Sequence, residues 1–311
     1  MNMKNIMRMG IVLAILVLIV LILTRVQHTS REKPLSHIDT NDWSTVQIDT
    51  QNSSITLQRS NGIWHVQQGS FTYRAEHDLV STVLANASTL EIGDMISKNP
   101  QRHSVFEVTQ ASGTRARLYA DSSDTPAGDF YLGKAAPDYV AYYLRFHGED
   151  AVYFSFNFTP YSLRRDFKQW RTKDLIDAQP TMIQKIVFTH DQDSTTIART
   201  ETGWEYNGEE RPSDVVQPVI EKIADLRATN VVSIDQEEAV SASLSEPVAQ
   251  LDVMHADQTD LISFFPIKDK DAIQQYYVRR NDIPGIFIVS SYTFDTLRTD
   301  IAGINEPSPS P

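Results

Sequence analysis

One stretch of the sequence carries the glycines and the lysine of a phosphate-binding loop. It reads GDFYLGKA over residues 128–135. Such a loop needs compact residues between its glycines, so that backbone amides reach the phosphate, and a Ser or Thr after the lysine to bind Mg²⁺. Here Phe130, Tyr131 and Leu132 fill the gap, and Ala135 has no hydroxyl. The stretch is more typical of a β-strand that ends in a glycine turn.

A second stretch begins like a calcium-binding loop at Asp191. Its sixth position is Thr196, where the loop needs Gly, and its twelfth is Thr202, where the ion needs a bidentate Glu. The pattern therefore favours a turn that joins two strands.

The other reactive side chains form no recognisable catalytic group. The chain has no cysteine, and its 8 histidines show neither the HxxxH nor the HExxH spacing of a helical zinc site. Three acid pairs are expected in polar loops as solvated turns: Glu149-Asp150, Glu209-Glu210 and Glu237-Glu238. We predict no catalytic residue, no metal ligand and no cofactor, and hence no enzyme. A hydrolase built on acids assembled in space is the least favoured alternative.

A basic helix is the best candidate for a contact site. Residues 160–173 are expected to form a helix with Arg164, Lys168 and Arg171 at i, i+4 and i+7. This side could contact anionic lipid headgroups or an acidic partner. The interpretation we favour is a connector whose basic side pairs with the acidic second half of the chain.

The elements that must position these side chains occur twice. The stretch RSNGIWHV (residues 59–66) recurs as RTETGWEY (residues 199–206). In each, a polar turn with Gly62 or Gly203 precedes Trp64 or Trp204. Glycine permits positive φ in a tight turn, and tryptophan fills a half-buried sheet face. The repeat predicts two equivalent strand–turn–strand units.

The same order of elements follows each of these turns. A helical pattern, several aromatic strands and a final helix follow Trp64 and then again Trp204. We therefore expect two tandem α+β domains, residues 43–178 and residues 179–302, each a mostly antiparallel sheet with packed helices. Residues 27–42 are expected to be a juxtamembrane linker, and residues 303–311 a disordered tail rich in Pro and Ser.

The N-terminus is expected to be a membrane anchor. Residues 9–23 are apolar apart from one glycine, with Lys4 and Arg8 before them and Arg25 after them. Because no small-residue cleavage site follows, an uncleaved transmembrane helix over residues 1–26 is preferred to a signal peptide. We expect a single-pass protein of the bacterial inner (cytoplasmic) membrane, with its N-terminus inside and its domains extracytoplasmic.

The charge of the chain argues against a nucleic-acid partner. Its formal net charge is −12, and residues 179–311 hold 22 acidic and 10 basic residues. Nucleic-acid binding needs a basic face for the phosphates. The simpler interpretation is a soluble surface whose like charges keep the molecules apart.

Taken together, the chain resembles the bacterial DUF4340 family, a domain of unknown function. The marks are the Trp turns, the helix entries Arg74-Ala75 and Arg211-Pro212, and the segment RTKDLI at residues 171–176, which leads into a strand. The resemblance covers about residues 43–302. It implies a membrane-anchored protein that accompanies components of ABC transporters, of the gliding-motility or auxiliary-transport type. It carries no established catalytic residues.

These observations favour a non-catalytic accessory or scaffold protein of an envelope complex. The expected partners are the lipid bilayer, through the N-terminal helix, and membrane proteins such as ABC-transporter subunits. The alternative is an extracytoplasmic binding module for a glycan, peptide or lipid. It would use the aromatic strands at Tyr142-Tyr143 or Tyr276-Tyr277.

Overall fold

The computed structural model describes residues 33–120, 123–269 and 272–305. Within them, no helix combines the length and the apolar character needed to cross a membrane. This finding contradicts the expected fold class, which began with a transmembrane helix. It also contradicts the expected localisation as a single-pass inner-membrane protein. Residues 1–26, where the anchor was predicted, lie outside the described residues, as do residues 27–32 and 306–311.

The described part of the chain divides into two compact units. The first unit comprises residues 33–56 and 81–164, and the second comprises residues 57–80 and 165–305. The expected domain boundaries at residues 43–178 and 179–302 stay a prediction.

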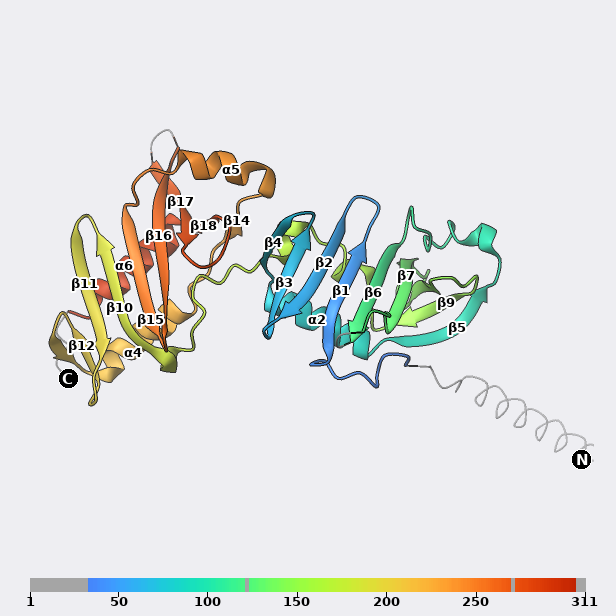
Figure 1. The fold of residues 1–311 in the computed structure, drawn as a ribbon, viewed down its shortest axis with the longest axis horizontal. Coiled ribbons are helices and arrows are strands. Elements are labelled where there is room, and N and C mark those ends of the chain that lie inside the picture. The colour runs from blue at the N-terminus through green and yellow to red at the C-terminus, as the bar shows by residue number, and fades with distance from the viewer. Residues whose placement is uncertain (1–32, 121–122, 270–271, 306–311) are drawn as a thin grey trace, which may run out of the picture. The chain divides into compact units, whose positions relative to one another are not determined.

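The described strands form two nine-stranded antiparallel sheets (Figure 1). The order in the first sheet is β4-β3-β2-β1-β6-β7-β8-β9-β5. Its strands are β1 (Trp43–Asp49), β2 (Ser54–Ser60), β3 (Ile63–Gln68), β4 (Phe71–Arg74), β5 (Glu91–Ser97), β6 (Thr114–Ala120), β7 (Gly128–Ala135), β8 (Tyr142–Phe146) and β9 (Val152–Phe156).

The second sheet has the same order, β13-β12-β11-β10-β15-β16-β17-β18-β14. Its strands are β10 (Ile183–His190), β11 (Asp193–Arg199), β12 (Trp204–Tyr206), β13 (Glu209–Arg211), β14 (Asn230–Val231), β15 (Ala249–His255), β16 (Gln258–Asp269), β17 (Ala272–Arg280) and β18 (Phe287–Ser290). In each sheet the first four strands (β1–β4 or β10–β13) lie on one side, and four later strands (β6–β9 or β15–β18) lie on the other. The strand that follows a helix, β5 or β14, forms the edge beyond these later strands. This agreement is the structural counterpart of the sequence repeat.

The described part of the chain is thus mostly sheet with few helices, which also corrects the expected α+β class. The α-helices are α2 (His77–Ser88), α3 (Phe167–Trp170), α4 (Ser213–Ala224), α5 (Ile234–Ser243) and α6 (Ser291–Gly303). Short 3-10 turns occur at η1 (Pro100–Arg102), η2 (Pro160–Ser162) and η3 (Pro180–Met182).

Two short apolar runs take different local structures. Residues 92–94 belong to strand β5, where Ile92 is buried opposite Ser155 of β9. Residues 105–108 lie in a loop, from which Phe106 and Val108 pack over β7. A short apolar run alone does not distinguish these states.

The core of the second unit lies between its sheet and the helices α4 and α6. Helix α6 packs against β17, β18 and α4, and Figure 1 shows these helices on one side of the strands. The buried side of α4 carries Val216, Ile220 and Ile223, and that of α6 carries Phe294 and Leu297. This spacing of three or four residues is the pattern expected of a half-buried helix.

Both ends of the described chain pack more closely than expected. Leu35, in the predicted linker, is 2 % exposed, and Ile304, in the predicted tail, is 1 % exposed.

Candidate functional site

A row of charged and aromatic side chains crosses one face of the first sheet. In the strand register, Asp49 of β1 lies opposite Arg115 of β6, and Arg115 lies opposite Tyr131 of β7. Tyr131 in turn lies opposite Arg145 of β8. The residues that alternate with this row are buried: Ile48, Ala116, Phe130, Leu132 and Leu144. Because successive side chains point to opposite faces of a strand, the row occupies the other face.

Two diagonal ion pairs hold this row together. Arg115 donates from Nε and Nη2 to the two carboxylate oxygens of Asp129, at 2.8 and 2.7 Å. Arg117 donates from Nη2 to Asp49, and the other oxygen of Asp49 accepts a 2.7 Å hydrogen bond from Ser54 Oγ. The hydrogen bonds with Asp129 raise the pKa of Arg115 above its ordinary value. Each carboxylate is therefore neutralised by a guanidinium group.

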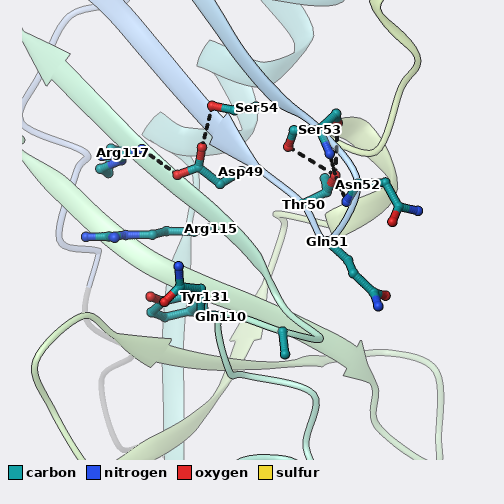
Figure 2. Close-up of a pocket in the computed structure, with 11 residues that line it drawn as sticks. Asp49, Thr50, Gln51, Asn52, Ser53, Ser54, Gln110, Arg115, Arg117 and Tyr131 are labelled. Carbon is teal, nitrogen blue, oxygen red and sulfur yellow. Dashed lines mark hydrogen bonds and ion pairs between the residues drawn. The ribbon is translucent and has the colours of Figure 1, made fainter.

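The turn between β1 and β2 is closed by its own hydroxyl groups. Thr50 Oγ1 accepts a hydrogen bond from the Ser53 amide at 3.1 Å, and the Thr50 amide donates to the Ser53 carbonyl at 2.8 Å. Figure 2 shows Arg115 and Arg117 on the same side of Asp49, whereas Gln51 and Asn52 point away from them. The turn and the arginines therefore form two distinct parts of one site.

These elements surround an open pocket of about 630 Å³. The ring of Tyr131 lies 5.6 Å from the Arg115 guanidinium and 4.6 Å from that of Arg145. Apart from Tyr131 and Ala111 the lining is polar: Asp49, Thr50, Gln51, Asn52, Ser53, Ser54, Gln110, Arg115 and Arg117.

This pocket has groups that can bind an anion. The carboxylate of Asp129 accepts hydrogen bonds from Arg115 at both oxygens, and that of Asp49 accepts them from Arg117 and Ser54. Guanidinium groups on a polar surface recognise anions and hydrogen-bond acceptors.

Sequence reasoning missed this site. Arg115 and Arg117 alternate with Ala116 and Leu118, which places two positive charges on one face of a predicted strand. That signal was present, but only the strand register shows which residues complete the site.

The predicted basic helix does not form as one element. Residues 160–162 make the turn η2, residues 167–170 make the single turn α3, and Arg171 is extended with φ −75° and ψ 138°. Arg164, Lys168 and Arg171 therefore share no helical side. The role of Arg164 and Lys168 as a partner contact stays a prediction.

Arg171 is instead a buried connector within the second unit, with only 2 % of its surface exposed. It donates from Nη1 to the Val232 carbonyl at 2.8 Å and lies 3.4 Å from Glu237. Its guanidinium lies 3.7 Å from the centre of the Tyr73 ring, and the Tyr73 hydroxyl donates to Glu237 at 2.8 Å. This burial argues against the predicted contact role for Arg171.

The two repeat markers occupy matching settings. Trp64 and Trp204 are 8 % and 3 % exposed, and each ring lies under an arginine of the preceding strand, Arg59 at 6.0 Å and Arg199 at 4.5 Å. The glycines differ. Gly62 has φ +80°, as predicted for the tight turn, whereas Gly203 has no positive φ and donates its amide to Thr200 Oγ1 at 3.0 Å.

The stretches that resemble a phosphate-binding loop and a calcium-binding loop form a strand and a turn, as the sequence predicted. Residues 128–135 form strand β7, and Asp191 and Gln192 form the turn between β10 and β11 with φ of 50° and 73°. Two acid pairs were misplaced. Glu209-Glu210 lies on β13, which pairs with β12, and Glu237-Glu238 lies on α5, where Glu237 forms an ion pair with Arg171. No group of three potential metal ligands occurs among the described residues.

In each predicted aromatic pair one tyrosine is buried and its neighbour is half-buried. Tyr143 and Tyr276 are 8 % and 7 % exposed, whereas Tyr142 and Tyr277 are of intermediate exposure. Two tyrosines outside the strands are largely exposed instead, Tyr161 at 67 % and Tyr292 at 79 %. Tyr161 follows strand β9 of the first sheet, and Tyr292 follows strand β18 of the second.

Comparison with known proteins identifies a family. The family model "Domain of unknown function (DUF4340)" matches residues 64–247, more than half of the chain. No curated protein and no solved structure matches. The resemblance noted from the sequence is therefore confirmed.

Proposed function

We propose that this chain, which belongs to the DUF4340 family, acts as a non-catalytic accessory protein that binds a partner protein. The observation that carries the proposal is the pair of exposed tyrosines, Tyr161 and Tyr292. A single exposed aromatic residue needs no explanation. Here, however, an exposed tyrosine occurs at the same point of two sheets that share one strand order. This repetition suggests a shared role, and tyrosine is enriched at the centres of protein interfaces.

Local structure holds each tyrosine outward. Thr159 Oγ1 accepts a hydrogen bond from the Tyr161 amide at 3.2 Å, at the start of η2. Ser290 Oγ accepts one from the Thr293 amide at 3.1 Å and caps α6, whose first turn carries Tyr292. A capped turn lowers the entropy lost when its side chain is immobilised in an interface.

The engaged state of the polar groups supports a role in binding rather than catalysis. Asp49 and Asp129 are neutralised by arginines, and Arg171 and Glu237 hold each other within the second unit. The partner class that we propose is a subunit of an ABC transporter, which the family resemblance implies.

Affinity capture from extracts of the source cells tests this proposal. The tagged full chain should recover a stoichiometric partner, and the double variant Tyr161→Ala, Tyr292→Ala should lose most of it. Tyr139→Ala is the matched control, since Tyr139 is 81 % exposed in the connection from β7 to β8, and the sequence from β16 to β17 has no tyrosine in the corresponding connection. Recovery of no stoichiometric partner, or equal recovery by the double variant, would refute the proposal.

A second candidate function is a binding module for a small ligand. The polar pocket beside Arg115 and Arg117 is the observation that favours it. A thermal-shift screen of saccharides, peptides and lipids tests this candidate. A screen without any hit would count against it.

A further inference from the structure

The arginines of the pocket keep donors that their ion pairs do not use. Arg115 binds Asp129 through Nε and Nη2, so its Nη1 remains available. Arg117 binds Asp49 through Nη2, so its Nη1 remains available as well. The Nε of Arg117 is buried, so a ligand in the open pocket would meet the Nη groups instead.

The charge around these donors suits a singly charged anion. Among the residues that line the pocket, the two guanidinium groups of Arg115 and Arg117 stand against the single carboxylate of Asp49. A carboxylate matches that excess of one positive charge and the planar fork of an arginine. A doubly charged phosphate would remain partly uncompensated beside Asp49.

The rest of the lining suits hydroxyl groups. Gln110 contributes a side-chain amide, and the hydroxyls of Thr50, Ser53 and Ser54, which already bond within the turn or to Asp49, contribute acceptor oxygens. The apolar part of the lining is confined to Ala111 and Tyr131. Amides and hydroxyls both donate and accept hydrogen bonds, as a saccharide does. A volume of about 630 Å³ is in the range of small-ligand pockets.

We propose that this pocket binds a saccharide that carries a carboxylate. The unused N–H groups of Arg115 and Arg117 hold the carboxylate, and Gln110 binds the neighbouring sugar hydroxyls. This inference does not depend on partner binding through Tyr161 and Tyr292, so the two proposals can fail separately.

Isothermal titration of the full chain with galacturonate tests the inference, with galactose, acetate and inorganic phosphate as comparison ligands. Galacturonate should bind, and at least about tenfold more tightly than galactose or acetate, with an affinity that falls as salt rises. Equal binding of galactose would overturn the role of the charge. Equal binding of acetate would overturn the saccharide, and tighter binding of phosphate would overturn the carboxylate.

Variants locate the binding. Arg117→Gln should weaken galacturonate binding at least about tenfold, since a hydrogen bond to a charged group is among the stronger ones. Gln110→Ala, on an exposed loop, should weaken galacturonate binding but leave acetate unchanged, and it decides the matter if Arg117→Gln does not fold. Arg102→Gln is the matched control, because Arg102 is an exposed arginine of the same unit outside the pocket. Unchanged affinity in the first two variants would place the ligand elsewhere and overturn the inference.

Discussion

The buried guanidinium of Arg171 should be a major source of stability for the second unit. Its neighbours come from three segments: Tyr73 on β4, the Val232 carbonyl, and Glu237 on α5. Burial lowers the pKa of Arg171, and the charge of Glu237 opposes that shift. Gly285 leaves the room that the side chain needs, since a Cβ there would lie 2.1 Å from Arg171 Nη2.

Replacing Arg171 with alanine removes one partner of a buried ion pair and leaves the other in place. Glu237, whose side chain is 18 % exposed, would keep only the Tyr73 hydroxyl, and the Val232 carbonyl would lose its donor. Removing one partner of a buried pair costs about 3–5 kcal/mol. A domain has only about 5–15 kcal/mol of stability, so Arg171→Ala should bring the second unit close to unfolding.

Urea unfolding followed by tryptophan fluorescence and circular dichroism measures this loss. Arg171→Met keeps most of the packing and leaves mainly the unsatisfied acceptors, so it should cost less, about 1–3 kcal/mol. Arg279→Ala is the control, because Arg279 is exposed on β17 and its loss should change stability by less than about 0.5 kcal/mol. If Arg171→Ala stays within about 1 kcal/mol of the wild type, the assignment of Arg171 as a buried connector is refuted.

Three further predictions concern single residues. Burial, with the hydrogen bond to Glu237, raises the pKa of Tyr73 from 10.0 to about 12, so its contribution is present below pH 10 and is lost as pH rises toward 12. As the pH rises from 10 toward 12, the free energy of unfolding measured in urea should therefore fall less for Tyr73→Phe than for the wild type. Equal falls in the two proteins would contradict this. Tyr139 has φ 58°, so Tyr139→Gly should stabilise the protein by about 1 kcal/mol, and a lower melting temperature would contradict the strain. A Cβ on Gly133 would lie 2.1 Å from the Phe106 carbonyl oxygen, so Gly133→Ala should lower stability by about 1–3 kcal/mol or more, and an unchanged thermal midpoint would contradict that contact.

The parts of the fold that follow from local patterns could be predicted from the sequence. Trp64 and Trp204 mark equivalent strands because a glycine-containing turn and an aromatic residue together specify a strand–turn–strand unit. The turn at Asn61 and Gly62 has positive φ at both residues, as the Asn-Gly pair predicts. Gly203 shows the limit of this reasoning, since a Thr200 hydroxyl closes that turn by another route.

The parts that depend on distant partners could not be predicted. Residues 164, 168 and 171 have helical spacing, but the backbone of the segment that follows forms hydrogen bonds with residues distant in the sequence. The Thr172 amide donates to the Arg74 carbonyl at 2.9 Å, and the Leu175 amide donates to the Leu226 carbonyl at 2.9 Å. These bonds keep the segment extended and bury Arg171. The segment at residues 171–176, which carries part of the family resemblance, is thus a backbone connector.

The pocket was missed for a related reason. Alternating arginines on a strand usually indicate a solvated face, and the sequence does not show that Asp49 and Tyr131 flank them. The anchor prediction rested on residues 1–26, outside the described residues, and no described helix is able to cross a membrane.

Partner binding through the matching tyrosines can be tested by cross-linking. A photoreactive phenylalanine analogue is placed at position 161 or 292 of the full chain, with position 139 as the control. Cross-links to one and the same protein from positions 161 and 292, and none from position 139, are the predicted result. Cross-links from neither position, or equal cross-linking from all three, would contradict the account.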